Sequence, residues 1–194
     1  MKKIFRIISN HFLKLRLTKN QPQMIYGYQI NGVKLPLTRV GSHTTIVGKK
    51  NLTLANDVFI GQFNFIESSN GLEINTGCQI TNYISILSHS SHQSIRLYGS
   101  EYRKHKDHIG YRKGKVKIGQ YTFIGPHCTI MPSTEIGKGS LVSAYSLLKG
   151  TYPDFAIISG NPAVVVGDTR EADEALLEKH PELRKMYDKW AKEV

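Results

Sequence analysis

The sequence is poor in several residue types, and each shortage narrows the classes of protein that it encodes. Its 194 residues include only two cysteines and one tryptophan. Cys78 and Cys128 fall on positions of an apolar repeat, so we expect small buried side chains rather than a disulfide or a metal pair. Hydrophobic residues make up 40% of the chain, which favours a folded domain over a disordered segment.

Long apolar runs are also missing. No segment approaches the roughly 18 apolar residues that indicate a membrane-spanning helix. The N-terminal sequence MKKIFRIISNHFLKLRL is interrupted too often by charge for a secretory signal, and no small-residue cleavage site follows. We therefore expect a cytoplasmic protein. Ile4, Ile8, Phe12 and Leu15 share one helical stripe, which predicts an N-terminal helix that caps the fold or contacts another subunit. The alternative is contact with the inner face of the membrane.

Acidic residues are scarce compared with basic ones. Asp and Glu number 15 against 26 Lys and Arg, which gives a formal net charge of +11. The excess is concentrated near the N-terminus and between residues 89 and 115. It favours an anionic partner, namely a phosphate-rich cofactor, an acidic membrane face or nucleic acid. Nucleic acid is disfavoured, since the sequence has no helix-turn-helix, zinc-finger or aromatic strand motif for stacked bases.

A strict six-residue repeat is the main pattern that is present. Its aliphatic positions are Ile118, Ile124, Ile130, Ile136, Val142 and Leu148, and small residues follow four positions later at Thr122, Cys128, Thr134, Ser140 and Ser146. Neither an α-helix nor a strand has a period of six. A coil of short strands joined by tight corners does, with the aliphatic residue pointing inward and the small one packed beside it.

A second six-residue ladder lies upstream and is out of phase with the first. It runs through Leu54, Ile60, Ile66, Leu72, Cys78 and Ile84. The segment from His89 to Lys115 lacks the repeat, so we expect one insertion that leaves the coil and returns. A long loop on a rigid scaffold often helps to build a site, although a plain surface excursion is the alternative.

These patterns predict an all-β fold with flanking helices, in three parts. Residues 1–39 form an N-terminal helix and an irregular lead-in, which is marked by Pro22, Gly27, Gly32 and Pro36. Residues 40–167 form the coil, with the insertion at 89–115. Residues 168–194 form a C-terminal helical segment, which Pro181 breaks into two pieces.

Three features together resemble the hexapeptide-repeat acyltransferase superfamily. They are the two ladders, the loop Ser88-His89-Ser90-Ser91-His92 and the closing Ser159-Gly160-Asn161-Pro162-Ala163. The resemblance implies a left-handed parallel β-helix and a homotrimer. It is strongest to the branch of bacterial sugar O-acetyltransferases. That branch implies transfer of acetyl from acetyl-CoA to a sugar hydroxyl in a surface polysaccharide, either capsule or O-antigen.

Acyl transfer to a hydroxyl requires a proton acceptor. A neutral imidazole titrates in the required range, and the resemblance implies a histidine where the first ladder ends, which is the position of His89. His92 is then expected to contact the sugar acceptor. A carboxylate often orients such a histidine; Glu67 is the first candidate, with Glu73 and Asp107 as rivals.

The resemblance also implies where acetyl-CoA lies, namely along the edge of the coil between two subunits. The expected contact residues are Gly125, Pro126, Ser143, Ala144, Lys149, Pro162 and Ala163. A backbone N–H of Gly125 or Ser143 is the expected oxyanion donor. The chain departs from the superfamily pattern at Val164-Val165-Val166, where a basic residue is usual, and at Tyr145, where glycine is common. Phosphate contacts are then expected from Lys138, Lys149 or Arg170.

Three other functions remain open at this point. An N-acetyltransferase acting on an amino-sugar nucleotide needs less activation of its acceptor. A structural β-helix without activity would not need His89. A zinc enzyme of the carbonic-anhydrase type would need a set of zinc-binding histidines, but the spacing of the histidines recommends none, so we expect no metal site. The sequence leaves open the acceptor, the group that is acylated and acyl groups beyond acetyl.

Overall fold

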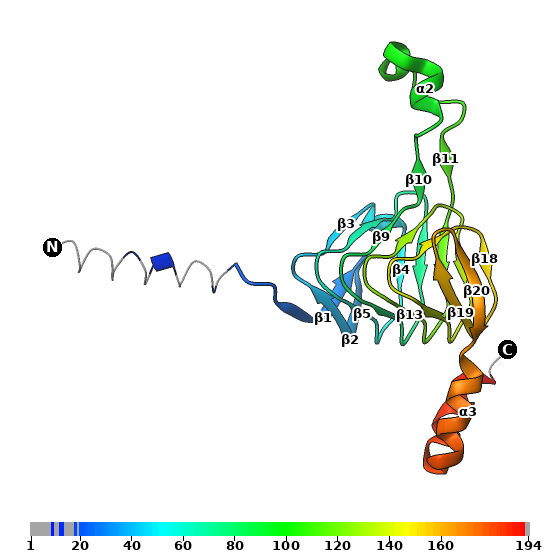
Figure 1. Cartoon of the computed structure of the whole chain (residues 1–194). Helices are drawn as coiled ribbons and strands as arrows, with labels where there is room; N and C mark the ends of the chain where they lie inside the picture. The colour runs from blue at the N-terminus through cyan, green and yellow to red at the C-terminus, as the bar shows by residue number, and fades with distance from the viewer. Residues whose placement is uncertain (1–8, 10–11, 14–17, 19, 193–194) are drawn as a thin grey trace.

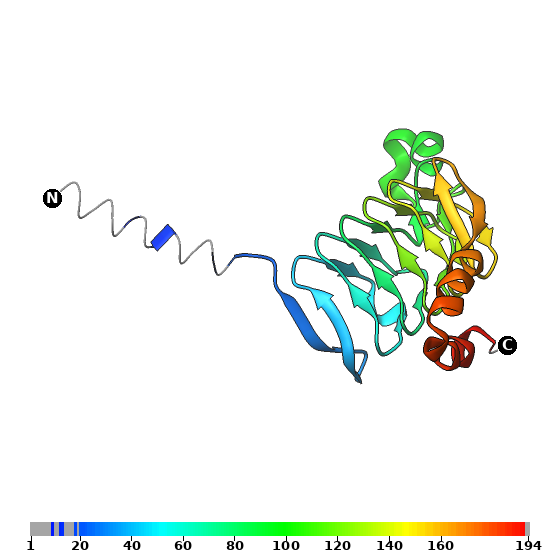
Figure 2. The ribbon, with the colours of Figure 1, turned by 60° about the horizontal axis from the view of Figure 1, so that its bottom comes forward.

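The computed structural model describes residues 9, 12–13, 18 and 20–192. Three sheets form the sides of a coil (Figures 1 and 2). Sheet A has the order β1-β2-β5-β8-β13-β16-β19-β20, sheet B the order β17-β14-β9-β6-β3 and sheet C the order β18-β15-β12-β7-β4. The chain passes from sheet A to sheet B to sheet C and back again.

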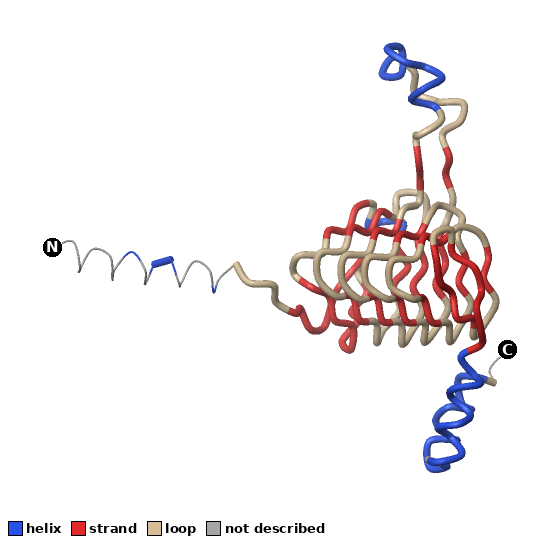
Figure 3. Tube along the Cα trace, in the orientation of Figure 1, coloured by secondary structure: helices blue, strands red, loops and turns tan. Residues whose placement is uncertain are grey.

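The strands within the coil are short, and Figure 3 shows them in red with the loops that join them. Sheet A contains β1 (Met24–Ile30), β2 (Val33–Gly41), β5 (Phe59–Ile60), β8 (Gln79–Ile80), β13 (Phe123–Ile124), β16 (Leu141–Val142), β19 (Ala156–Gly160) and β20 (Ala163–Asp168). Sheet B contains β3 (Thr45–Val47), β6 (Phe65–Glu67), β9 (Ser85–Ile86), β14 (Thr129–Ile130) and β17 (Leu147–Leu148). Sheet C contains β4 (Leu52–Leu54), β7 (Leu72–Ile74), β12 (Val116–Ile118), β15 (Glu135–Ile136) and β18 (Thr151–Tyr152). The short helix η1 (Lys49–Asn51) lies between β3 and β4.

The core lies inside the coil, where each strand pairs in parallel with its counterpart in the next turn. Ile124 pairs with Ile80 on one side and with Val142 on the other. Ile118, Ile124 and Ile130 are fully buried and Ile136 is 3% exposed, which confirms the inward positions that the downstream ladder predicts. Both cysteines are free and buried. The parallel sheets fit the left-handed β-helix expected from the sequence.

The upstream ladder is correct only in its first half. Leu54, Ile60 and Ile66 hold the inward aliphatic position, but the ladder then continues through Ile74, Ile80 and Ile86, which pair with Ile118, Ile124 and Ile130. Leu72, Cys78 and Ile84 are buried beside them, at the position of the small residues. The phase changes because Ile66 and Ile74 are eight residues apart rather than six, and a strict six-residue count does not allow for the two extra residues.

The lead-in is a β-hairpin rather than an irregular segment. β1 and β2 pair antiparallel, and Ile30 lies opposite Val33. The turn between them is Asn31-Gly32, with φ of 51° and 81°. Asn-Gly is the favoured pair for a turn that needs positive φ at both central residues. The sequence predicts an irregular segment here because prolines and glycines disfavour strands. The predicted N-terminal helix lies almost wholly outside the described residues.

An arm projects from the coil between sheets B and C (Figure 1). It consists of β10 (His89–Ser90), α2 (Ser94–Tyr98), η2 (Gly99–Lys104) and β11 (Arg112–Lys113). The stem is antiparallel, with His89 opposite Lys113 and Ser90 opposite Arg112. The arm therefore occupies the part of the sequence that lacks the repeat and returns the chain to the coil at β12.

The chain continues past the coil into α3 (Thr169–Lys179), η3 (Pro181–Leu183) and α4 (Arg184–Ala191). The break predicted at Pro181 is confirmed. The Asp168 carboxylate accepts the Arg170 N–H at 2.9 Å and caps α3. Trp190 packs on Tyr121 and Phe155, with ring centroids 4.5 and 5.7 Å apart, so α4 is held against the coil. Among the described residues, no helix has the length and apolar character needed to cross a membrane.

Candidate active site

The predicted site residues lie at two corners of the coil. The AB corner joins sheet A to sheet B and carries Gly125, Pro126, Ser143 and Ala144. The BC corner joins sheet B to sheet C and carries Glu67, the whole arm and Lys149. Sheet B separates the two corners, so the structure does not bring all the predicted residues together within one chain.

His89 and Glu67 meet at the BC corner. The Nδ1 atom of His89 lies 2.7 Å from Oε2 of Glu67. Glu67 ends β6 and His89 begins β10, one turn of the coil later. The Glu67 residue is 3% exposed, whereas the His89 side chain is 34% exposed. The carboxylate is therefore buried behind an imidazole that still reaches solvent.

Glu67 is held by donors on both oxygens. Oε2 accepts the Ser88 N–H at 3.0 Å and the Ser88 hydroxyl at 2.7 Å, and Oε1 accepts the Ser69 N–H at 2.7 Å. Burial by itself raises the pKa of Glu67, but the hydrogen bonds from Ser69 and Ser88 outweigh it and lower the pKa to about 2. Glu67 is thus ionised at neutral pH and can only accept hydrogen bonds.

The ionised carboxylate fixes the tautomer of His89. Because Glu67 cannot donate, Nδ1 of His89 must carry the proton that joins the two residues. In the neutral imidazole, Nε2 is then left with its lone pair free to accept a proton. This arrangement can act as a general base toward a group that approaches from the exposed side of His89.

The arm supplies two further neighbours of His89 that the sequence did not indicate. The ring of Tyr111 stacks on the imidazole, with centroids 5.4 Å apart and planes 11° apart. Lys113 lies directly opposite His89 in the stem, and its Nζ lies 5.6 Å from the Tyr111 ring centroid. Nothing local in the sequence links Tyr111 to His89, because the contact depends on how the arm returns to the coil.

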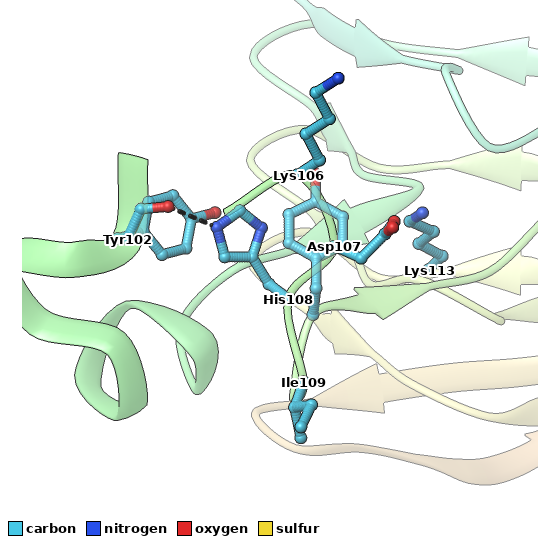
Figure 4. A pocket seen from close by; sticks show the side chains of 7 residues that line it. Tyr102, Lys106, Asp107, His108, Ile109 and Lys113 are labelled. Atoms are coloured by element: carbon cyan, nitrogen blue, oxygen red, sulfur yellow. Dashed lines mark hydrogen bonds between the residues drawn. The ribbon is translucent and has the colours of Figure 1, made fainter. Parts of the chain in front are cut away.

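The rival carboxylates lie elsewhere. Glu73 pairs with Lys115, with Oε2 and Nζ 2.7 Å apart, and no described histidine contacts it. Asp107 lines a pocket in the arm (Figure 4). Of the three candidates, Glu67 is therefore the one in contact with His89.

His92 and Lys149 line one pocket of about 560 Å³ at the BC corner. The Nδ1 atom of His92 lies 2.7 Å from the Ser90 hydroxyl. Tyr152 links Lys149 to the closing turn, because its hydroxyl accepts the Lys149 N–H at 3.2 Å and donates to the Ala163 carbonyl oxygen at 3.2 Å. Tyr152 thus joins Lys149 at the BC corner to Ala163 in the closing turn, which follows β19 of sheet A and lies beside Ser146 through a hydrogen bond from the Gly160 N–H.

The AB corner brings the other predicted coenzyme contacts together. A Cβ on Gly125 would lie 2.7 Å from the Ala144 nitrogen, so glycine allows the two turns to approach. The N–H groups of Gly125 and Ser143 donate to the carbonyl oxygens of Val142 and Ile158, at 2.8 and 2.9 Å. Neither is therefore free as the oxyanion donor that we expected. The Ala144 N–H has no acceptor within the described residues and is the better candidate.

The other two residues expected to contact phosphate, Lys138 and Arg170, lie at neither the AB nor the BC corner. Lys138 and Arg170 lie over the Phe155 ring, 5.9 and 4.9 Å from its centroid. The Arg170 guanidinium also pairs with Asp168. Both cations belong to the corner that joins sheet C to sheet A, where the C-terminal helices pack, so Lys149 is the one of the three near the predicted site.

An exposed column of stacked rings runs along the AB corner. It contains His43, Phe63, Tyr83, His127 and Tyr145, with successive centroids 5.4, 5.2, 4.9 and 4.8 Å apart. The ring of His127 is almost parallel to those of Tyr83 and Tyr145, with angles of 3° and 4° between the planes. Tyr145, which departs from the superfamily pattern, is the terminal ring of this column and is 70% exposed.

Comparison with known proteins finds similarity to acetyltransferases. Residues 115–150 match the family model described as bacterial transferase hexapeptide (six repeats). YvoF of Bacillus subtilis (strain 168), named as a candidate acetyltransferase, is 42% identical over 66 residues, which cover 34% of this chain and 38% of YvoF. WbbJ of Escherichia coli (strain K12), named as a candidate O-acetyl transferase of lipopolysaccharide biosynthesis, is 26% identical over 66% of this chain and 65% of WbbJ. The chain thus spans less than two thirds of both relatives.

Solved structures share the fold. A variant of AntD, an N-acyltransferase from Bacillus cereus in complex with dTDP and coenzyme A, aligns with a TM-score of 0.54 and 18% identity over 75% of this chain and 88% of AntD. The polySia specific acetyltransferase NeuO aligns with a TM-score of 0.50 and 19% identity over 61% of this chain and 52% of NeuO. These likenesses show a shared fold, and the family match covers the repeat at residues 115–150. Within the described residues, no three His, Cys, Asp or Glu side chains gather to hold a metal ion.

Proposed function

We propose that the protein is an acetyltransferase that moves the acetyl group of acetyl-CoA to a sugar hydroxyl during synthesis of a bacterial surface polysaccharide, either capsule or O-antigen. The observation that carries the proposal is the contact of His89 with the ionised Glu67, which leaves Nε2 as a proton acceptor. The likeness to YvoF and WbbJ, both named as acetyltransferases, supports acetyl transfer, and the coenzyme A in the AntD structure supports the co-substrate.

The proposed reaction is a direct transfer. Nε2 of His89 removes the proton of the acceptor hydroxyl as its oxygen attacks the thioester carbonyl carbon. The negative charge that develops on the carbonyl oxygen needs a donor, and we assign that role to the Ala144 N–H. The C–S bond then breaks, and the imidazolium of His89 returns its proton to the sulfur, so that coenzyme A leaves as the thiol. Glu67 stays ionised and stabilises the imidazolium while it lasts.

The proposal includes an assembly, because the two corners are separate. Gly125, Pro126, Ser143 and Ala144 lie at the AB corner, whereas His89 lies at the BC corner beyond sheet B. Both sets can contact one acetyl-CoA only if the AB corner of one copy faces the BC corner of another. The faces of the coil carry exposed apolar side chains, among them Phe65, Phe123 and Leu141, which suit contact between copies. We propose a homotrimer with three such sites.

The test of this function is a transfer assay on the purified protein. Acetyl-CoA is mixed with a panel of sugars and amino sugars, thiol release is followed, and products are identified by mass spectrometry. We expect an acetyl ester on a sugar hydroxyl and at least about a hundredfold slower ester formation with His89→Ala. An acetyl amide on an amino sugar, formed equally well by His89→Ala, would instead indicate N-acetyl transfer. Failure to bind acetyl-CoA at all would favour a structural β-helix.

A further inference from the structure

The arm holds a pocket of its own next to His89. The pocket has a volume of about 770 Å³ and is lined by Tyr102, Lys106, Asp107, His108, Ile109, Tyr111 and Lys113 (Figure 4). The His108 ring stacks on Tyr102, with centroids 3.9 Å apart, and its Nε2 lies 2.7 Å from the Tyr102 carbonyl oxygen. These contacts give the pocket an aromatic wall inside the arm.

Two cations of the pocket are not neutralised by the protein. Within the part of the chain that the structure describes, neither Lys106 nor Lys113 forms an ion pair. Other lysines of the same region do: Lys104 pairs with Glu101 at 2.8 Å, and Lys115 pairs with Glu73 at 2.7 Å. Asp107 is the one carboxylate among the lining residues. Uncompensated ammonium groups beside an open pocket favour an anionic ligand.

The pocket is joined to the proposed base through shared residues. Tyr111 lines it and stacks on His89. Lys113 lines it and lies opposite His89 in the stem, and residues opposite each other in an antiparallel pair carry their side chains on the same face. An anionic group held by Lys113 would therefore lie within reach of a sugar whose hydroxyl meets Nε2 of His89.

We propose that the arm pocket binds the phosphate or diphosphate group of the acceptor, so that the acceptor is a glycosyl phosphate or diphosphate rather than a neutral sugar. This inference rests on the proposed transfer to a sugar. Lys106 and Lys113 hold the phosphate oxygens as point charges. Asp107 accepts a hydrogen bond from a sugar hydroxyl, and the aromatic wall packs against the apolar face of the ring.

The first test measures binding without turnover. Inorganic pyrophosphate is titrated into the full chain saturated with coenzyme A, which occupies the sites for its own phosphates. The double variant Lys106→Ala/Lys113→Ala should bind pyrophosphate about tenfold more weakly or worse, because two charge-assisted contacts are lost. The control Arg103→Ala/Lys104→Ala removes the same charge from η2, outside the pocket, and should bind like the unaltered protein.

Three results of this titration would overturn the inference. They are no pyrophosphate binding in the presence of coenzyme A, equal weakening by the control variant, and loss of coenzyme A binding by Lys106→Ala/Lys113→Ala. The last result would assign the two lysines to the co-substrate. None of the three depends on acetyl transfer, so the proposed function is left untouched by them.

The second test compares acceptors and separates the two sources of the diphosphate. One hexose series is offered as free sugars, as uridine diphosphate esters and as polyprenyl diphosphate esters in detergent. We expect kcat/KM to be higher for a diphosphate ester than for the free sugar, and the double variant to abolish that preference. Preference for the uridine or the polyprenyl ester identifies the source. Equal use of the free sugar would contradict the inference while the acetyltransferase activity stands.

Discussion

At the scale of single residues, the proposed chemistry depends on Glu67 as much as on His89. Three donors from Ser69 and Ser88, together with Nδ1 of His89, satisfy a carboxylate that is almost fully buried. An unpaired carboxylate in that place would be costly. The same contacts that stabilise the corner therefore keep Glu67 ionised and hold the imidazole in one tautomer.

His89→Ala should lower turnover by about a hundredfold to ten-thousandfold, which is the usual contribution of a positioned proton acceptor. Binding of acetyl-CoA should stay within about twofold, because the imidazole meets the acceptor and the thioester rather than the nucleotide. Steady-state kinetics and a calorimetric titration with coenzyme A measure the two effects. His92→Ala is the matched control, with a smaller effect that falls on acceptor KM. Near-normal turnover without His89 would rule out the general-base role.

Glu67→Gln tests the carboxylate through stability as well as rate. The folded-state pKa of about 2 lies below the ordinary glutamate value of 4.5, so ionised Glu67 stabilises the fold fully above pH 4.5, and this contribution is lost as the pH falls toward about 2. The variant should be less stable than the parent at neutral pH, and the difference should shrink over that acidic window. Denaturant unfolding at several pH values measures it. A difference that does not depend on pH would contradict the ionised state.

The same variant has a kinetic signature. Its amide nitrogen can donate to Nδ1 of His89, which favours the wrong tautomer, so kcat should fall by roughly a hundredfold or more while acceptor KM changes little. A Glu73→Gln control should leave kcat unchanged, since Glu73 pairs with Lys115. Equal losses in the two variants would indicate a general structural effect.

Sequence and structure agree unevenly over these residues. The resemblance to the superfamily implied a histidine at the position of His89 and a carboxylate partner, for which Glu67 was the first candidate because it lies one turn of the coil earlier. Tyr111 and Lys113 could not be predicted, because their contacts with His89 arise from the antiparallel stem of the arm, which has no repeat. The oxyanion donors expected at Gly125 and Ser143 were wrong, since the parallel ladder of the coil uses those N–H groups.

At the scale of elements, the AB corner shows how the coil tolerates left-handed residues. Phe63, Tyr83, His127 and Tyr145 all have φ between 58° and 61°, a conformation that costs an L-residue roughly 1–2 kcal/mol. Each ring stacks on the next, and an aromatic pair contributes about 0.5–1.5 kcal/mol beyond its buried area. Stacking therefore offsets much of the strain that glycine would avoid.

Substitutions of Tyr145 separate these two effects. Tyr145→Ala loses the stack on His127 but keeps the positive φ, so it should lower the unfolding free energy by about 0.5–1.5 kcal/mol. Tyr145→Gly loses the same stack but relieves the strain, and should lie between the alanine variant and the parent. Thermal melts give the order. Tyr26→Ala, which removes an exposed tyrosine without a stacked partner in the described chain, is the control. An alanine variant as stable as the parent would refute the role of the column.

The regular elements were the easiest to predict. A period of six sets the inward residues of each turn, so the downstream coil followed directly from the sequence. The upstream phase failed where the corner after Glu67 lengthens, and the hairpin of β1 and β2 was missed although Asn31-Gly32 signals it. In both places, turn residues rather than the apolar period decide the path of the chain.

At the scale of the whole molecule, the separation of the two corners is the main constraint on function. The arm lies on the BC side, and the turns that contain Gly125 and Ala144 lie on the AB side. If both contribute to one acetyl transfer, then a single chain holds two halves of different sites. The proposed homotrimer therefore follows from the reaction as well as from the exposed apolar faces.

Subunit complementation tests this account most directly. His89→Ala removes the base, and Ala144→Trp blocks the AB corner with a bulky ring at an exposed position, so each variant alone should be nearly inactive. Co-expressed with different tags and isolated as mixed assemblies, they should regain about a third of the parent activity. In a mixed trimer, one of the three interfaces pairs an intact His89 with an intact Ala144. Mixed assemblies with no more activity than either variant alone would contradict a site shared between copies.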